Sequence, residues 1–257
     1  MDRETNEHYP WLTLFRRRML ISVAAKIFVT DDLLVRKASE HLKVQATKIG
    51  VTCFGGVVPA APETSTLNPV IRDAVRWIEQ RKSAYPDPIV GLWVGTVAGK
   101  NIAGLYDLLR LAKRGKSENV PVLFMVIGPI DELQGTRHAA LLSDLRQADN
   151  IFLHCKYSTI PVESWPLLAD FVWKPLDDLS VSLTTYHAAS ARMPLVCCSN
   201  TFIGEMVEHY KLGFAVDVET VDMQELEARV RTWPKKNAIR FLEGHTWEKG
   251  ARNLFSV

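Results

Sequence analysis

The sequence has little of what marks a metal-binding, disulfide-stapled, nucleic-acid-binding or membrane-spanning protein. Its four cysteines, Cys53, Cys155, Cys197 and Cys198, have no spacing typical of a metal site or a disulfide framework, which favours a reducing, cytoplasmic location. The formal net charge is only +2, with lysine and arginine scattered, so we expect no nucleic-acid partner. No apolar run approaches the roughly 20 residues that a membrane-spanning helix needs.

A membrane contact is considered only at residues 15–28. Three consecutive arginines precede a short apolar stretch that Lys26 interrupts, so this segment is neither a signal peptide nor a transmembrane helix. A basic, partly amphipathic helix can lie on an anionic membrane surface. Two interpretations therefore stay open, a solvated helix face and a peripheral membrane contact.

The composition is that of an ordinary globular protein, with 47% apolar and 23% charged residues in 257. Short, continuous apolar segments alternate with helical patterns along most of the chain, which is typical of parallel strands covered by helices on both faces. Strands are predicted at residues 27–29, 49–53, 89–94, 120–127, 151–154, 171–173, 195–198 and 214–216. The sequence thus predicts an α/β fold with a doubly wound parallel sheet, in which ligands bind beyond the carboxyl ends of the strands.

The loops that follow these strands carry recognisable motifs. Val94-Gly95-Thr96 precedes Lys100-Asn101 at a predicted helix start, and Phe124 to Gly128 forms a second strand that ends in glycine. Farther along, Met193-Pro194-Leu195-Val196 leads through Ser199-Asn200 to Gly204-Glu205-Met206-Val207 and Gly213-Phe214-Ala215-Val216. In order and spacing, these motifs resemble the donor-binding domain of the family 4 GT-B glycosyltransferases. The resemblance extends from about residue 24 to residue 257.

The resemblance implies a Rossmann-like C-terminal domain of a GT-B fold with a partial N-terminal domain. On that basis we divide the chain into an acceptor-domain remnant (1–60), a linker and helix (61–88), a nucleotide-sugar-binding domain (89–240) and a C-terminal crossing helix (241–257). The implied reaction is retaining transfer of a hexosyl group from a nucleotide diphosphate sugar to a carbohydrate or lipid-linked acceptor, in glycan biosynthesis. We expect no cofactor, because the nucleotide sugar is a substrate, and no metal, because the Asp-x-Asp motif of GT-A enzymes is missing.

The resemblance also assigns the site. Lys100 and Asp178 are the candidate catalytic residues, with Lys100 beside the diphosphate, where a helix start and a lysine favour an anion. The candidate donor-binding residues are Gly95, Thr96, Lys100, Gly128, His187, Ser199, Asn200 and Glu205.

Two departures from the family pattern bear on activity. Thr96 stands where the family commonly has an arginine, and Leu179 and His187 stand where it has two glutamates. Asp178, one residue from the first glutamate position, could replace it only if the loop shifts. Three interpretations remain open: a transferase that needs an acceptor-domain partner subunit or a second copy, a non-catalytic nucleotide-sugar-binding or partner subunit, and another enzyme of GT-B architecture such as an epimerase.

Overall fold

The chain forms two compact units, each made of more than one stretch of sequence. The computed structural model describes residues 19–53, 55–56, 68–96, 100–175 and 182–255. The smaller unit comprises residues 1–55, 179–181 and 245–257, and the larger comprises 56–178 and 182–244.

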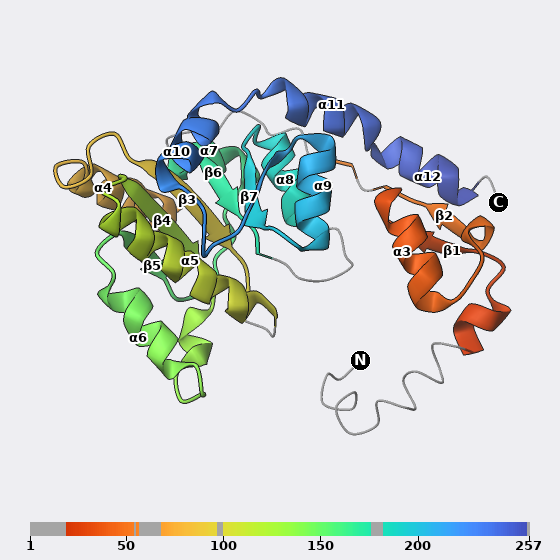
Figure 1. Ribbon diagram of the computed structural model, residues 1–257, viewed down its shortest axis with the longest axis horizontal. Helices are drawn as coiled ribbons and strands as arrows, with labels where there is room; N and C mark the ends of the chain where they lie inside the picture. Colours follow the sequence, from red (N-terminus) through yellow and green to blue (C-terminus); the bar gives the residue numbers. More distant parts are fainter. Residues whose placement is uncertain (1–18, 54, 57–67, 97–99, 176–181, 256–257) are drawn as a thin grey trace. The chain divides into compact units, whose positions relative to one another are not determined.

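The larger unit is built on a six-stranded, wholly parallel sheet with the strand order β5-β4-β3-β6-β7-β8 (Figure 1). Its strands are β3 (Ile89–Val94), β4 (Val122–Ile127), β5 (Ile151–His154), β6 (Phe171–Trp173), β7 (Leu195–Cys198) and β8 (Gly213–Val216). Every residue of β4 and β6 is buried, and so are the first five residues of β3. The continuous apolar runs of the sequence thus form central strands covered on both faces, and the predicted doubly wound α/β fold is confirmed.

The helices between β3 and β8 connect the parallel strands of the larger unit, and its described part contains eight α-helices in all. They are α4 (Pro69–Arg81), α5 (Lys100–Ser117), α6 (Ala139–Gln147), α7 (Trp165–Leu168), α8 (Leu183–Ser190), α9 (Phe202–Tyr210), α10 (Met223–Thr232) and α11 (Lys236–Gly244), with short 3-10 turns at Ile130–Leu133 and Val162–Ser164. Crossovers between parallel strands are right-handed, so α5 and α6 lie on one face of the sheet, and α8 and α9 lie on the other. Helix α4 packs on α7 and β5 within this unit.

The smaller unit has a two-stranded parallel sheet among its described residues. Strands β1 (Ile27–Val29) and β2 (Ile49–Val51) pair in register, and α3 (Leu33–Leu42), a short 3-10 turn (Ala46–Lys48) and α12 (Trp247–Phe255) complete the described part. Helix α12 lies close to β2, where Thr52 Oγ1 donates to the Gly250 carbonyl at 3.2 Å. The region at 241–257 therefore contains the end of α11 and the whole of α12, which belong to different units.

Asp31 joins distant parts of the chain in the smaller unit. It is fully buried, accepts the Leu33 N–H at 2.9 Å through Oδ1, and lies 3.2 Å from His245 Nε2 through Oδ2. No helix in the described part of the chain is both long and apolar enough to cross a membrane. Residues 15–18 of the segment considered for membrane contact lie outside the described residues, and Met19, Leu20 and Val23 within it are exposed.

Candidate functional site

The strand order reverses between β3 and β6, the two central strands of the sheet. From β3 the chain builds outward through β4 to β5, and it then returns to the other side of β3 for β6, β7 and β8. The connections that leave β3 and β6 therefore run to opposite faces and leave a crevice beyond the carboxyl ends of these strands. This topological switch point is where a ligand is expected, and it defines the candidate site.

Two glycines form the floor of the site on its β3 side. The N–H of Gly95 donates to the Ile127 carbonyl at 3.2 Å, and the N–H of Gly128 donates to the His154 carbonyl at 3.0 Å. A Cβ atom on Gly128 would lie 2.0 Å from the Gly95 carbonyl oxygen. The ends of β3 and β4 can approach this closely only because position 128 has no side chain.

Helix α5 begins directly beyond this floor. Thr96 is exposed, and its carbonyl accepts a hydrogen bond from Asn101 Nδ2 at 2.7 Å. Lys100 is the first residue of α5, and residues 97–99 lie outside the described part of the chain. The first N–H groups of a helix have no intrahelical partners, and the helix dipole is positive at this end, so an anion is favoured here.

Close packing fixes α5 against the end of β6. Trp173 is buried, and its indole Nε1 donates to the Gly104 carbonyl at 3.0 Å. A Cβ atom on Gly104 would lie 1.8 Å from Pro175 Cγ, so only glycine fits at this point of the helix. The two sides of the switch point are thereby held at a defined distance from each other.

The end of β7 supplies the other rim. The N–H of Ser199 donates to the Val216 carbonyl at 2.7 Å, and Asn200 is exposed in the left-handed region with φ of 62°. Thr201 Oγ1 accepts the Gly204 N–H at 3.0 Å and donates to the Cys198 carbonyl at 2.8 Å, which caps α9. Ser199 lies two strands from Gly95, a separation of roughly 10 Å at the usual strand spacing.

A contact between α5 and β7 ties this rim to the helix. The Cys198 thiol donates to Asp107 Oδ2 at 3.5 Å, so the second turn of α5 lies beside the residue that precedes Ser199. Helix α5 therefore borders the ends of β3, β6 and β7. Of the residues predicted from sequence, Gly95, Thr96 and Gly128 lie together at the start of this border, along with the backbone of Lys100. Ser199 and Asn200 lie at its far end.

The remaining predicted site residues are Glu205, His187 and Asp178. Glu205 is exposed in the first turn of α9, beside the Ser199 turn. His187 lies within α8, half-buried, with its ring 5.9 Å from that of Trp165 in an edge-on arrangement. Burial lowers the pKa of His187 from its ordinary value, so the ring is neutral near pH 7. Asp178 lies outside the described residues, and its predicted role stays a prediction.

Lys174 is not among the residues predicted for the site. It directly follows β6 at the switch point and is only 8% exposed, the one buried lysine among the residues whose burial the structure describes. Its backbone N–H donates to the Val196 carbonyl at 2.9 Å, so the sheet hydrogen bonding continues through it. The sequence does show a lysine directly after an apolar strand, which could have marked Lys174 as a candidate. Only the strand order, however, places this residue beside β3.

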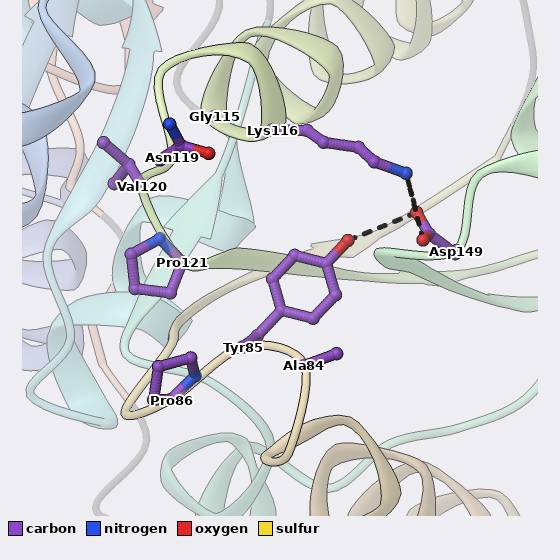
Figure 2. Close-up of a pocket in the computed structure, with 9 residues that line it drawn as sticks. All are labelled: Ala84, Tyr85, Pro86, Gly115, Lys116, Asn119, Val120, Pro121 and Asp149. Atoms are coloured by element: carbon purple, nitrogen blue, oxygen red, sulfur yellow. Dashed lines mark hydrogen bonds and ion pairs between the residues drawn. The ribbon is translucent and has the colours of Figure 1, made fainter.

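A separate cavity of about 450 Å³ lies at the opposite edge of the sheet (Figure 2). It is lined by the segments that precede β3, β4 and β5, and includes Tyr85, Lys116, Pro121 and Asp149. Lys116 Nζ donates to both carboxylate oxygens of Asp149 at 3.0 Å, and the Tyr85 hydroxyl bonds to the same carboxylate at 3.2 Å.

The charged groups of this cavity are occupied with one another. The hydrogen bond from Lys116 lowers the pKa of Asp149, and the bond to Asp149 raises the pKa of Lys116. Burial, followed by the charge of Asp149, raises the pKa of Tyr85. The cluster lies at the amino ends of the strands, away from the switch point, and we do not assign the ligand to it.

No family of known sequences matches the chain, and no curated protein matches it. Among the described residues there is no group of three or more histidine, cysteine, aspartate or glutamate side chains that could hold a metal ion.

Solved structures do resemble the chain. A glycosyltransferase from Rickettsia africae matches with a TM-score of 0.63 and 11% identity, over 100% of this chain and 66% of that one. The sucrose-phosphate synthase of Thermosynechococcus elongatus matches with a TM-score of 0.61 and 13% identity, over 94% and 60%. The Anabaena protein HepE in complex with UDP-glucose matches with a TM-score of 0.59 and 15% identity, over 94% and 67%.

These likenesses establish the fold of the chain as that of a GT-B glycosyltransferase. The chain spans 60–67% of the lengths of the three structures. At 11–15% identity the comparison concerns the fold, so activity, substrates and partners are taken up below as proposals.

Proposed function

We propose that the protein is a glycosyltransferase that binds a nucleotide diphosphate sugar at the carboxyl edge of its six-stranded sheet. The observation that carries this proposal is the switch point between β3 and β6, with the glycine floor and the start of α5 beside it. The helix start and its dipole suit a diphosphate, and the turn of half-buried Ser199 and exposed Asn200 suits hydroxyl groups of the donor. HepE, a structural neighbour, binds UDP-glucose, which supports the same ligand class.

The proposed reaction is retaining transfer of a hexosyl group to a carbohydrate or lipid-linked acceptor. The bond between the anomeric carbon and the diphosphate oxygen breaks, and the acceptor oxygen bonds to that carbon. The leaving diphosphate takes the acceptor proton, so no strong enzymic base is needed. The role of the protein is then to neutralise charge that develops on the diphosphate, which the helix start and Lys100 would do.

The acceptor side is proposed to come from a partner subunit or a second copy. The described part of the smaller unit has one two-stranded parallel sheet, which is small beside the six-stranded sheet of the larger unit. Thermal denaturation with a panel of UDP, GDP and their hexose conjugates tests donor binding. A ligand at one hundred times its Kd should raise the free energy of unfolding by about 2.7 kcal/mol.

The proposal would be contradicted if no member of the panel raised the free energy of unfolding. Transfer or hydrolysis of the donor sugar is then assayed in wild type and in Lys100→Ala. If the variant loses no activity, Lys100 does not belong to the site.

One observation favours a non-catalytic alternative, a nucleotide-sugar-binding subunit. His187, at the place of a family glutamate, packs edge-on against Trp165 and carries no charge near pH 7. Donor binding without transfer or hydrolysis, alone and with an acceptor-domain partner, would favour this alternative.

A further inference from the structure

Lys174 lies beside the end of β3 at the switch point. Strands β3 and β6 pair with Leu92 opposite Val172, and two residues farther along this register Lys174 stands opposite Val94. The residue is therefore on the strand next to the glycine floor, at the height where β3 ends. No other described lysine follows directly on a strand of this sheet.

The side chain of Lys174 comes to the crevice from the face opposite α5. Trp173, one residue earlier, points to α5 and bonds to Gly104. Side chains alternate along a strand, so that of Lys174 points to the other face and leans along the strand direction toward its carboxyl end. A diphosphate in the crevice would have the start of α5 on one side and Lys174 on the other.

Burial strengthens the electrostatic attraction between the Lys174 ammonium group and an anion. At 8% exposure, Lys174 is largely shielded from water, and the attraction between opposite charges grows as the surrounding dielectric constant falls. Thr96, on the other strand end, is exposed and uncharged. Lys174 is thus a buried cation on the strand next to β3, at the switch point.

The backbone on both sides of Lys174 is rigidly held. Trp173 is anchored by its bond to Gly104, and Pro175 packs against the same glycine. The backbone from which the Lys174 side chain projects is therefore positioned by the same contact that positions α5.

We propose that Lys174 binds the diphosphate of the donor nucleotide. The inference rests on the proposed function and names a residue of the same site. The affinity for nucleoside diphosphates should therefore depend on the Lys174 charge, whereas the affinity for the uncharged nucleosides should not.

The test is isothermal titration of UDP, GDP, uridine and guanosine into wild type, Lys174→Met and Lys174→Arg. Hydrogen bonds to charged groups contribute enough that Lys174→Met should weaken binding of the diphosphate about 10- to 100-fold. Nucleoside affinity should stay unchanged, and Lys174→Arg should retain most of the diphosphate affinity. Lys116→Met, the same substitution at an exposed lysine of the opposite edge, is the matched control and should bind as wild type does.

The outcomes separate the inference from the proposed function. Wild type that binds neither diphosphate would overturn the proposed function. Wild type that binds, with Lys174→Met binding equally well or losing nucleoside affinity in the same proportion, would overturn the role of Lys174 alone.

If Lys174→Met does not fold, NMR spectra of the folded wild type, labelled with ¹³C at lysine Cε, replace the variant. The Lys174 signal is assigned by its absence in Lys174→Arg. The Lys174 signal should shift with whichever of UDP and GDP binds and not with its nucleoside. An unmoved signal in the presence of bound diphosphate would overturn the proposal.

Discussion

Gly95 and Gly128 show how single residues set the geometry of the site. Both were predicted to bind the donor from their places at strand ends, and the structure gives a packing reason for Gly128. Its missing side chain leaves room for the Gly95 carbonyl, which a Cβ atom would approach to 2.0 Å. The obstacle is a backbone atom, so relief requires the ends of β3 and β4 to move apart.

Gly128→Ala should therefore destabilise the fold and weaken donor binding together. Overpacking costs about 1–3 kcal/mol in the free energy of unfolding, and the displaced Gly95 loop should bind the nucleotide less well. Urea denaturation and titration with the nucleotide that the panel identifies measure the two effects. Gly244→Ala is the control, because a Cβ atom there meets nothing within 4 Å. Stability of Gly128→Ala equal to that of wild type would contradict the account.

His187 gives the stability a predictable pH dependence. Burial lowers its pKa in the folded state below the ordinary value of 6.5, so the unfolded chain takes up the proton first as pH falls. Well above pH 6.5 the ring is neutral in both states and contributes nothing. Below that pH it lowers stability until the pH passes the depressed folded pKa.

His187→Phe removes this contribution and keeps the ring contact with Trp165. Wild type should lose more stability between pH 7 and pH 5 than the variant, as measured by urea denaturation at each pH. Equal losses would mean that His187 is solvated rather than packed. A large fall in nucleotide affinity in the variant would instead support the predicted role of His187 in donor binding.

Residue-level prediction from sequence can use local clues, and it lacks the long-range ones. Gly95 and Ser199 each directly follow a recognisable strand and Lys100 begins α5, so their places in the fold are local, while their roles in binding stay predictions. Lys174 follows a strand too, but its importance comes from the neighbour of that strand, β3. Strand order is a long-range property, and no local pattern encodes it.

At the scale of elements, apolar runs located every strand of the large sheet, with small shifts at some ends. Strand β4 begins at Val122 rather than residue 120, because the N–H of Val120 closes the end of α5 by donating to the Gly115 carbonyl, and Pro121 has no N–H. Helix α5 continues to Ser117. The last turns of α5 are rich in charged residues, as loops often are in sequence. Their side chains instead form surface ion pairs, such as that of Arg114 with Glu118.

The fit of α5 against β6 depends on Gly104, and Gly104→Ala tests it. The added methyl group would meet Pro175 Cγ at 1.8 Å and should push the helix away from the strand. We expect loss of about 1–3 kcal/mol in the free energy of unfolding and a clear loss of nucleotide affinity.

Ala103→Gly, at the exposed neighbouring position, is the matched control. It should cost up to about 1 kcal/mol through helix propensity while leaving nucleotide affinity unchanged. Loss of affinity in both variants would show that general weakening of α5 is responsible, and would contradict the role of the close contact.

At the scale of the whole molecule, the chain divides in a way that sequence could not predict. The smaller unit takes segments from both ends, and the contact between Asp31 and His245 spans 214 positions. The division into 1–60, 61–88, 89–240 and 241–257 followed changes along the sequence, whereas compact units follow contacts in space. Helix α4, for example, joins the larger unit because it packs on α7 and β5.

Asp31→Ala tests whether the two units act independently. It leaves the buried His245 without its carboxylate and the Leu33 N–H without its acceptor, which should cost about 1–3 kcal/mol per unsatisfied group. Nucleotide affinity should stay unchanged, because the candidate site lies within the larger unit. Titration and urea denaturation of the same preparation measure both quantities, and a loss of affinity in the folded variant would contradict the independence.

The account rests on the location of the donor diphosphate, and a crystal structure of the protein with the bound nucleotide measures it most directly. The predicted result is a diphosphate beyond the ends of β3 and β6, between Gly95 and Lys174, with the Ser199 turn on its far side. A nucleotide in the cavity of Tyr85 and Asp149, at the opposite edge of the sheet, would contradict the account.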